Sequence, residues 1–237
     1  MTEYDFSDKI VLVTGSSGAV GGRILDFFTS HGASTSGTYL KELSIDRSRS
    51  ESGPVDFYRC DTMNSADVGS LVRTIAKKHG RIDILVNTVG GYIGGKSVVN
   101  LEEEEWNKMF GLNLYSAFLI TKYVVPLMLR SGYGRIVHIS SYTGTSAQGF
   151  DSAYASSKAG LIRFVESVSK EMKDLDLTIN CVLPSIIDTK ANREAMPDAN
   201  FKQWVAIDDL VNVIAFLCSG DSQSISGSAI PVLKSAS

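Results

Sequence analysis

Short runs of apolar and β-branched residues recur along the chain, and each run is bounded by glycine or polar residues. The strong runs occupy residues 10–14, 82–87, 135–140, 177–183 and 229–233, and weaker runs lie at 34–39 and 55–60. Runs of this length and composition are typical of buried strands in a parallel sheet. The pattern therefore predicts a strand at each of these places.

Between the strands, apolar residues recur at helical spacing. The predicted helices cover residues 20–30, 66–79, 101–130, 155–173 and 207–219. The third follows a cap-like Asn100 and carries acidic residues at 102–105, which complement the helix dipole. Strands alternating with helices throughout 1–237 predict a single α/β domain of the Rossmann type, a doubly wound parallel sheet with helices on both faces. Ligands bind such sheets beyond the carboxyl ends of the strands. The polar stretch 44–54 is predicted as a surface loop.

Composition narrows the class of protein. The 237 residues are 43% hydrophobic and 21% charged, with a formal net charge of −3, which is typical of a globular protein. A pI near 5.6 argues against a nucleic-acid partner, because phosphate binding needs clustered excess Lys and Arg. The N-terminal sequence has no signal-peptide pattern, and no stretch has 18 uninterrupted apolar residues, so we expect a cytoplasmic protein with no membrane span.

Neither the cysteines nor the histidines have the spacing of a metal site. The cysteines also do not suggest a disulfide framework, being odd in number and far apart, which fits a reducing cytoplasm. We therefore expect no metal to be required. The residues are Cys60, Cys181, Cys218, His31, His79 and His138.

A glycine-rich loop joins the first predicted strand to the first helix. In it, Gly15 permits a tight turn, Gly18 allows close approach of a pyrophosphate, and Gly21 allows close helix packing. An ordinary glycine-rich turn is the alternative, but the place of the loop between strand and helix favours dinucleotide binding. The predicted cofactor contacts of the loop are Gly15, Ser16, Ser17, Gly18, Val20 and Gly21.

The end of the second strand bears on the choice of cofactor. Tyr39 occupies the place where an NAD enzyme usually has an acidic residue, whose carboxylate would repel a 2′-phosphate. The absence of an acidic residue here, with Thr38 and Lys41 nearby, favours NADP over NAD. Lys41 could equally be an ordinary surface lysine. Asp61, after the third strand, is a candidate acceptor for the adenine amino group or an exposed turn aspartate.

A tyrosine and a lysine four residues apart, Tyr154 and Lys158, share one face of a predicted helix. Ser141 follows a strand end 13 residues earlier, and Asn113 lies within the predicted helix 101–130. A second pair with the same spacing, Tyr92 and Lys96, lies in a glycine-rich stretch where a helix is not expected, so we set it aside.

These residues together resemble the short-chain dehydrogenase/reductase family, over essentially the whole chain. Asn113, Ser141, Tyr154 and Lys158 match its catalytic tetrad in type and spacing. Its TGxxxGxG motif is met at Thr14, Gly15 and Gly21, but Ala19 replaces the middle glycine. Its NNAG motif appears as residues 87–90 and its PGxxxT motif as residues 184–189, with Ser185 in place of glycine. The resemblance implies further cofactor contacts at Asn87, Gly90, Tyr154, Lys158, Pro184, Ile187 and Thr189.

The resemblance also implies a mechanism. Tyr154 would be the general acid in reduction and the general base in oxidation of a small carbonyl or alcohol substrate, with NADP(H) or NAD(H) exchanging the hydride. Lys158 would favour the phenolate by its positive charge, and Ser141 would donate a hydrogen bond to the substrate oxygen. Asn113 would hold a water that connects Lys158 to solvent. Family membership implies a homodimer or homotetramer built by helices 101–130 and 155–173.

The C-terminal third also resembles the dihydropteridine reductases, in residues 183–204 and in the glycine-rich stretch 90–95. Those enzymes lack the catalytic serine, whereas Ser141 is present here. The shared feature is a predicted lid, residues 187–204, that would fold over the cofactor and bring Met196, Phe201 and Trp204 near the substrate or only pack them onto the body. A pterin reductase and a non-catalytic dinucleotide sensor are the alternative functions.

Overall fold

The computed structural model describes residues 4–41 and 55–234. Within them, seven parallel strands form one sheet in the order β3-β2-β1-β4-β5-β6-β7. This is the predicted doubly wound Rossmann-type fold. The strands are β1 (Ile10–Thr14), β2 (Ser34–Tyr39), β3 (Val55–Arg59), β4 (Ile84–Asn87), β5 (Gly134–Ile139), β6 (Leu177–Pro184) and β7 (Ala229–Val232). The predicted loop 44–54 lies outside the described residues.

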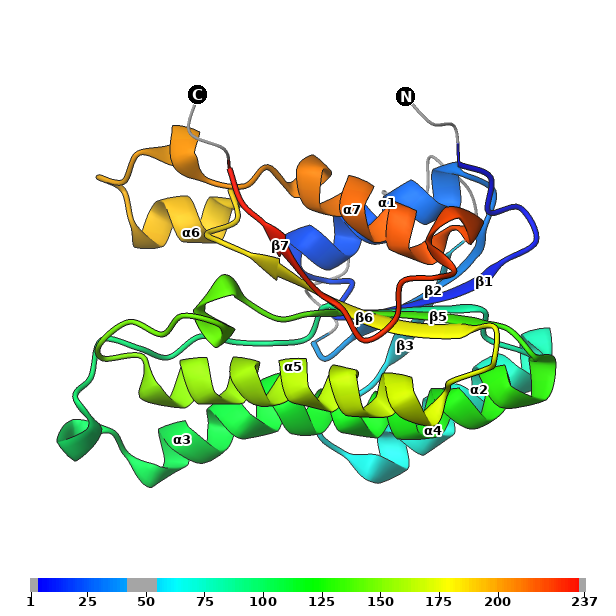
Figure 1. The fold of residues 1–237 in the computed structure, drawn as a ribbon, viewed down its shortest axis with the longest axis horizontal. Coiled ribbons are helices and arrows are strands. Elements are labelled where there is room, and N and C mark those ends of the chain that lie inside the picture. Colours follow the sequence, from blue (N-terminus) through cyan, green and yellow to red (C-terminus); the bar gives the residue numbers. More distant parts are fainter. Residues whose placement is uncertain (1–3, 42–54, 235–237) are drawn as a thin grey trace.

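Helices cover both faces of the sheet. In Figure 1, α1 and α7 lie on one face and α2, α4 and α5 on the other, while α6 stands beyond the carboxyl end of β6. The helices are α1 (Ala19–Ser30), α2 (Ser65–His79), α3 (Glu103–Phe110), α4 (Ser116–Ser131), α5 (Ser152–Glu171), α6 (Lys190–Ala195) and α7 (Ile207–Cys218).

The alternation of side chains along each strand divides the core in two. In β1, Leu12 packs with the helices α2, α4 and α5, whereas Val11 and Val13 pack with α1 and α7. All three are fully buried. Strands buried on both faces read as continuous apolar runs, which explains why the sequence predicted them well.

The predicted helix 101–130 is interrupted. The π-helical turn Gly111–Tyr115 separates α3 from α4, and it contains Asn113. The helix begins later than predicted, because Glu102 is the N-cap and forms a capping box with Glu105, while Asn100 lies in a short 3-10 turn. The π turn adds a residue to the helix and so changes the direction in which Asn113 points.

The helical run Glu103–Ser131 is long and apolar enough, by length and composition, to cross a membrane. Half of its most apolar window is buried inside the protein. The contacts of α4 with α2 and with β5 account for this burial, and core helices pass the same test.

Candidate active site

The glycine loop between β1 and α1 has the conformation that its glycines permit. Gly15 has φ +73°, and a Cβ there would lie 2.8 Å from Thr88 Oγ1. A Cβ on Gly21 would lie 2.4 Å from the carbonyl oxygen of Gly15, so no side chain fits. Gly18 is the N-cap of α1 and is exposed. The exposed loop at a helix N-terminus fits the pyrophosphate of a dinucleotide.

Some predicted cofactor residues have side chains that build the loop itself. Ser16 is 4% exposed, and its Oγ donates to the carbonyl oxygen of Thr38 at 3.0 Å. Asn87 accepts from Thr14 Oγ1 at 2.5 Å, and its Nδ2 lies 3.2 Å from His138 Nδ1. These buried contacts hold β1, β2, β4 and β5 together below the loop. Ser17 and Val20 are half-buried and stay predicted cofactor contacts.

The residues predicted for the adenosine end lie at the carboxyl ends of β2 and β3. Tyr39 is 9% exposed and Lys41 is exposed. The strand register pairs Tyr39 with Arg59, an exposed cation that the sequence reasoning missed. Asp61 accepts from the backbone N–H of Met63 at 2.9 Å, which closes a turn and leaves the carboxylate further acceptor capacity.

Tyr154 and Lys158 lie on one face of α5, as predicted, and Ser141 lies two residues after the end of β5, at the start of the loop that leads to α5. The Ser141 side chain lies close enough to the Tyr154 hydroxyl to lower its pKa. Lys158 is 5% exposed; its Nζ donates to the carbonyl oxygen of Ile139 at 2.9 Å and lies 5.9 Å from the centre of the Tyr154 ring. Ser141 also accepts from the N–H of Thr143 at 3.2 Å. Three of the four predicted catalytic residues thus meet at the carboxyl edge of the sheet.

The pKa of Tyr154 differs from the expectation that the charge of Lys158 would lower it. Burial and the charge of Asp151 raise the pKa of Tyr154, whereas the side-chain interaction with Ser141 lowers it. Burial is the largest of these effects, so the pKa of Tyr154 lies above its usual value. Lys158 was expected to lower this pKa and does not dominate it. Burial lowers the pKa of Lys158 itself to about 8. The phenol is therefore held in its protonated form, which suits a proton donor.

Asn113 contacts the loop after β4 and the helix α5, which carries Tyr154 and Lys158. Its Oδ1 accepts from the N–H of Gly91 at 2.9 Å, and its Nδ2 donates to the carbonyl oxygen of Gly91 at 3.1 Å and to Ser157 Oγ at 3.0 Å. A Cβ on Gly90 would lie 2.9 Å from Asn113 Oδ1 and 3.2 Å from Lys158 Nζ. Asn113 and Lys158 therefore approach the loop after β4 because Gly90 has no side chain.

Two further residues join the site, and the sequence reasoning missed both. The Tyr92 ring packs edge-on against the Tyr154 ring, with centroids 4.9 Å apart and planes at 82°. The Tyr92 hydroxyl donates to Asp151 Oδ1 at 2.9 Å. Tyr92 was set aside together with Lys96 because a helix is not expected in their glycine-rich stretch, and Lys96 pairs with Glu105 at 2.7 Å. The only sequence feature that could have indicated their place in the site is that Asp151 stands three residues before Tyr154.

The predicted lid, residues 187–204, follows β6. Thr189 caps α6 by accepting from the N–H of Asn192 at 3.2 Å, and Ile187 pairs with Val205 in a β-bridge. Trp204 is 6% exposed and contacts Phe201, with ring centroids 4.8 Å apart. Trp204 is thus buried beside Phe201, while contact of Met196, Phe201 and Trp204 with substrate stays a prediction, as do cofactor contacts of Pro184, Ile187 and Thr189.

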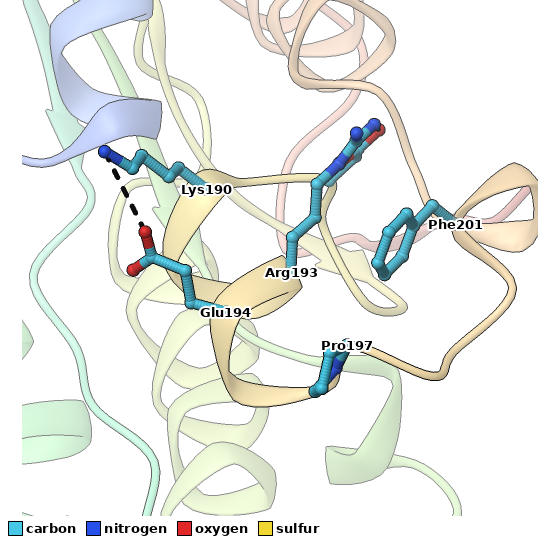
Figure 2. Close-up of a pocket in the computed structure, with 6 residues that line it drawn as sticks. Lys190, Arg193, Glu194, Pro197 and Phe201 are labelled. Carbon is cyan, nitrogen blue, oxygen red and sulfur yellow. Dashed lines mark hydrogen bonds and ion pairs between the residues drawn. The ribbon is translucent and has the colours of Figure 1, made fainter.

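A pocket of about 580 Å³ lies within the predicted lid. Figure 2 shows Arg193 and Phe201 on its wall and the ion pair between Lys190 and Glu194 along α6. Arg193 binds Asp188 through two hydrogen bonds of 2.6 and 2.7 Å and lies 4.8 Å from the centre of the Phe201 ring. These contacts hold α6 to the segment before it, through Asp188, and to the segment after it, through Phe201.

No metal site emerges in the part of the chain that the structure describes, since no three His, Cys, Asp or Glu side chains there could share an ion. His138 is buried on β5 between Asn87 and Thr121. Burial and, to a smaller extent, the charge of Lys158 lower its pKa to about 3, so this histidine is neutral at ordinary pH. The tyrosine, lysine and serine at the sheet edge stay the predicted catalytic residues.

The family model for short chain dehydrogenases matches residues 9–200. The chain belongs to the short-chain dehydrogenase/reductase family. It is an NAD(P)-dependent oxidoreductase of that family, as the resemblance predicted. The tetrad roles carried over with the resemblance remain predictions, and the geometry above gives their physical basis.

Several relatives match nearly end to end. The 3-oxoacyl-[acyl-carrier-protein] reductase FabG of Escherichia coli is 30% identical, covering 96% of this chain and 97% of its own. Human dehydrogenase/reductase SDR family member 4 is also 30% identical, covering 98% and 89%. The solved aldohexose dehydrogenase of Thermoplasma acidophilum is 26% identical with a TM-score of 0.85, covering 96% and 94%.

The low pKa of Lys158 predicts a pH-dependent stability. The folded protein releases this proton near pH 8 and the unfolded chain near pH 10.5, so the penalty of burying the ammonium is present below pH 8 and is relieved as the pH rises. The free energy of unfolding of the wild type, relative to Lys158→Met, should rise by roughly 2 kcal/mol between pH 7 and 9.5.

Urea denaturation of both proteins across this range measures the difference. The comparison cancels the buried cysteines and Tyr154, which titrate in both proteins. If the difference in the free energy of unfolding between the two proteins does not change with pH, folding does not lower the pKa of Lys158.

Proposed function

We propose that this protein reduces a ketone or aldehyde to an alcohol at the expense of NADPH, with Tyr154 as the proton donor. The observation that carries the proposal is the meeting of Tyr154, Lys158 and Ser141 at the carboxyl edge of the sheet, with Lys158 Nζ 5.9 Å from the centre of the Tyr154 ring and the Ser141 side chain acting on the pKa of the phenol. A protonated phenol is the form that reduction requires, because the substrate oxygen gains a proton in that direction.

Each residue has one part in this reaction. When bound, the nicotinamide supplies the hydride. Ser141 donates a hydrogen bond to the substrate oxygen as negative charge develops there, and Tyr154 gives it a proton. The buried Lys158 lies within reach of the phenolate that remains and stabilises it by opposite charge. Asn113 is a positioning residue that holds the loop after β4 through both backbone groups of Gly91.

The cofactor preference rests on the residues at the ends of β2 and β3. Tyr39 brings no carboxylate to this place, and Arg59 lies beside it in the sheet register. A guanidinium binds a 2′-phosphate well because it offers several N–H donors in one plane. Arg59, with Lys41, therefore supports NADPH over NADH.

The substrate is proposed only as a class. The name of the bacterial relative specifies a 3-oxoacyl carrier-protein thioester and that of the archaeal one an aldohexose. Both contain a carbonyl or a carbinol at the reacting carbon. The presence of Ser141 favours a substrate that passes through an alkoxide-like state over a quinonoid pterin.

We also propose a homo-oligomer formed by α4 and α5, working in a reducing cytoplasm. A groove of about 360 Å³ runs between these helices and is largely apolar. On its edge Phe118 is 38% exposed and Leu129 is 50% exposed. Cys60, Cys181 and Cys218 are all free and buried, which suits that compartment.

Paired variants test the chemistry. Tyr154→Phe should abolish ketone reduction while NADPH still raises the melting temperature, because only the proton donor is lost. Ser141→Ala should lower kcat about a hundredfold, the scale of a lost oxyanion donor. Single-turnover rates over a panel of ketones measure both. Full activity of Tyr154→Phe would disprove the assignment, and an unchanged Ser141→Ala rate would favour the pterin reductase.

Thermal unfolding with matched NADPH and NADH tests the cofactor assignment. A ligand at a hundred times its Kd stabilises the folded state by about 2.7 kcal/mol. We expect the larger shift with NADPH, and Arg59→Gln should reduce that shift without changing the one with NADH. Arg163→Gln, at an exposed arginine on α5, is the matched control. Equal shifts with both nucleotides would remove the preference.

The oligomer is tested by placing charge in the α4–α5 groove. Leu129→Glu should convert the assembly to monomers, because an unpaired carboxylate in an apolar interface is costly. Sedimentation velocity of the wild type and the variant measures this. Val99→Glu, at a residue 85% exposed outside the groove, should leave the assembly intact. A monomeric wild type contradicts the proposal.

A further inference from the structure

Asp151 occupies a position where it would normally stabilise its own helix. It is the N-cap of α5, but its side chain makes no capping hydrogen bond. An aspartate at this position usually accepts from the N–H groups of the first turn. Here its carboxylate accepts instead from the Tyr92 hydroxyl at 2.9 Å, across 59 residues of chain.

The backbone on both sides is shaped to make this pairing. A Cβ on Gly94 would lie 2.2 Å from both Asp151 Oδ1 and the Tyr92 hydroxyl, so only glycine leaves room for the hydrogen bond. Phe150, directly before Asp151, has φ +68°, a left-handed conformation that a bulky residue rarely adopts. Its carbonyl oxygen accepts from the N–H of Gly95 at 2.9 Å, which joins the same two loops a second time.

The pair stands beside the reacting group. The Tyr92 ring packs edge-on against the ring of Tyr154, with centroids 4.9 Å apart, and Tyr92 is 62% exposed. Asp151 acts on both phenols: burial and the hydrogen bond to Asp151 raise the pKa of Tyr92 to about 12, and the charge of Asp151 contributes to the raised pKa of Tyr154. A substrate held by Tyr154 is therefore within the field of this carboxylate.

The chemistry of the pair defines what it would accept. A carboxylate has about four lone-pair positions, so one hydrogen bond from Tyr92 leaves Asp151 able to accept another. A hydroxyl group on the substrate can supply that donor, whereas a substrate carboxylate would meet a like charge. A purely apolar substituent would gain nothing from the pair.

We propose that Tyr92 and Asp151 determine substrate specificity, selecting carbonyl compounds with a neutral hydroxyl group close to the carbonyl and disfavouring those with a carboxylate there. This inference rests on the proposed ketone reduction. It assigns the pair to substrate recognition and leaves proton transfer to Tyr154.

Three ketones with the same methyl-ketone end test the proposal: 2-pentanone, 4-hydroxy-2-butanone and acetoacetate. The first two differ only in a terminal methyl or hydroxyl group. With NADPH, the wild type should show a kcat/KM for 4-hydroxy-2-butanone about tenfold above that for 2-pentanone, the scale of a hydrogen bond to a charged group, and acetoacetate should be the poorest.

The variant Asp151→Asn removes the charge and keeps the shape. The kcat/KM ratio of acetoacetate to 2-pentanone should rise about tenfold, and the ratio of 4-hydroxy-2-butanone to 2-pentanone should fall towards one, mainly through KM. Tyr92→Phe keeps the ring against Tyr154 but no longer orients the carboxylate, so it should lower the second ratio. Asp174→Asn makes the same change beyond the other end of α5, at an exposed residue, and should alter neither ratio.

The outcomes separate the two proposals. If the wild type reduces these ketones and Asp151→Asn leaves both ratios as Asp174→Asn does, the specificity role of the pair is wrong and the proposed reduction stands. If the wild type reduces no ketone while NADPH still stabilises it, the proposed reduction fails, and the inference about the pair fails with it.

Discussion

The burial of the Lys158 ammonium is the constraint around which the active site is built. A charge removed from water is costly unless polar groups replace its hydration. The carbonyl oxygen of Ile139 provides one such partner, and Ser140 ties the backbone of the same lysine to the end of β5 through a 2.9 Å hydrogen bond. Two glycines make the space: a Cβ on Gly90 would lie 3.2 Å from Nζ, and one on Gly144 would lie 2.9 Å from the Lys158 backbone.

This arrangement is possible because the sheet is entirely parallel. All its carboxyl ends meet at one edge, so the loops after β1, β4, β5 and β6 lie close together although they are distant in sequence. The glycine loop, the loop carrying Tyr92 and the serine loop each carry residues that we propose for one part of the reaction. The core below needs only to be apolar and well packed, which is why relatives sharing about 30% of their residues can keep it.

The parts that the sequence predicted well depend on short-range pattern. Buried strands, the helix that places Tyr154 four residues before Lys158, and the glycines of the first loop all follow from local spacing and backbone geometry. What escaped prediction depends on distance in space. The hydrogen bond from Tyr92 to Asp151 joins residues 59 apart, Arg59 meets Tyr39 only through the sheet register, and the raised pKa of Tyr154 reflects burial, which no spacing reveals.

The π turn at Gly111–Tyr115 allows the two parts of one long helix, α3 and α4, to be oriented separately. Each residue of a regular α-helix turns the chain by about 100°, so one added residue rotates everything beyond it by that amount. α3 and α4 can thus aim their faces independently, with Asn113 pointing inward between them. Loss of one residue here would restore regular α-helical pairing, rotate α4 relative to α3, and move the Asn113 amide away from Gly91.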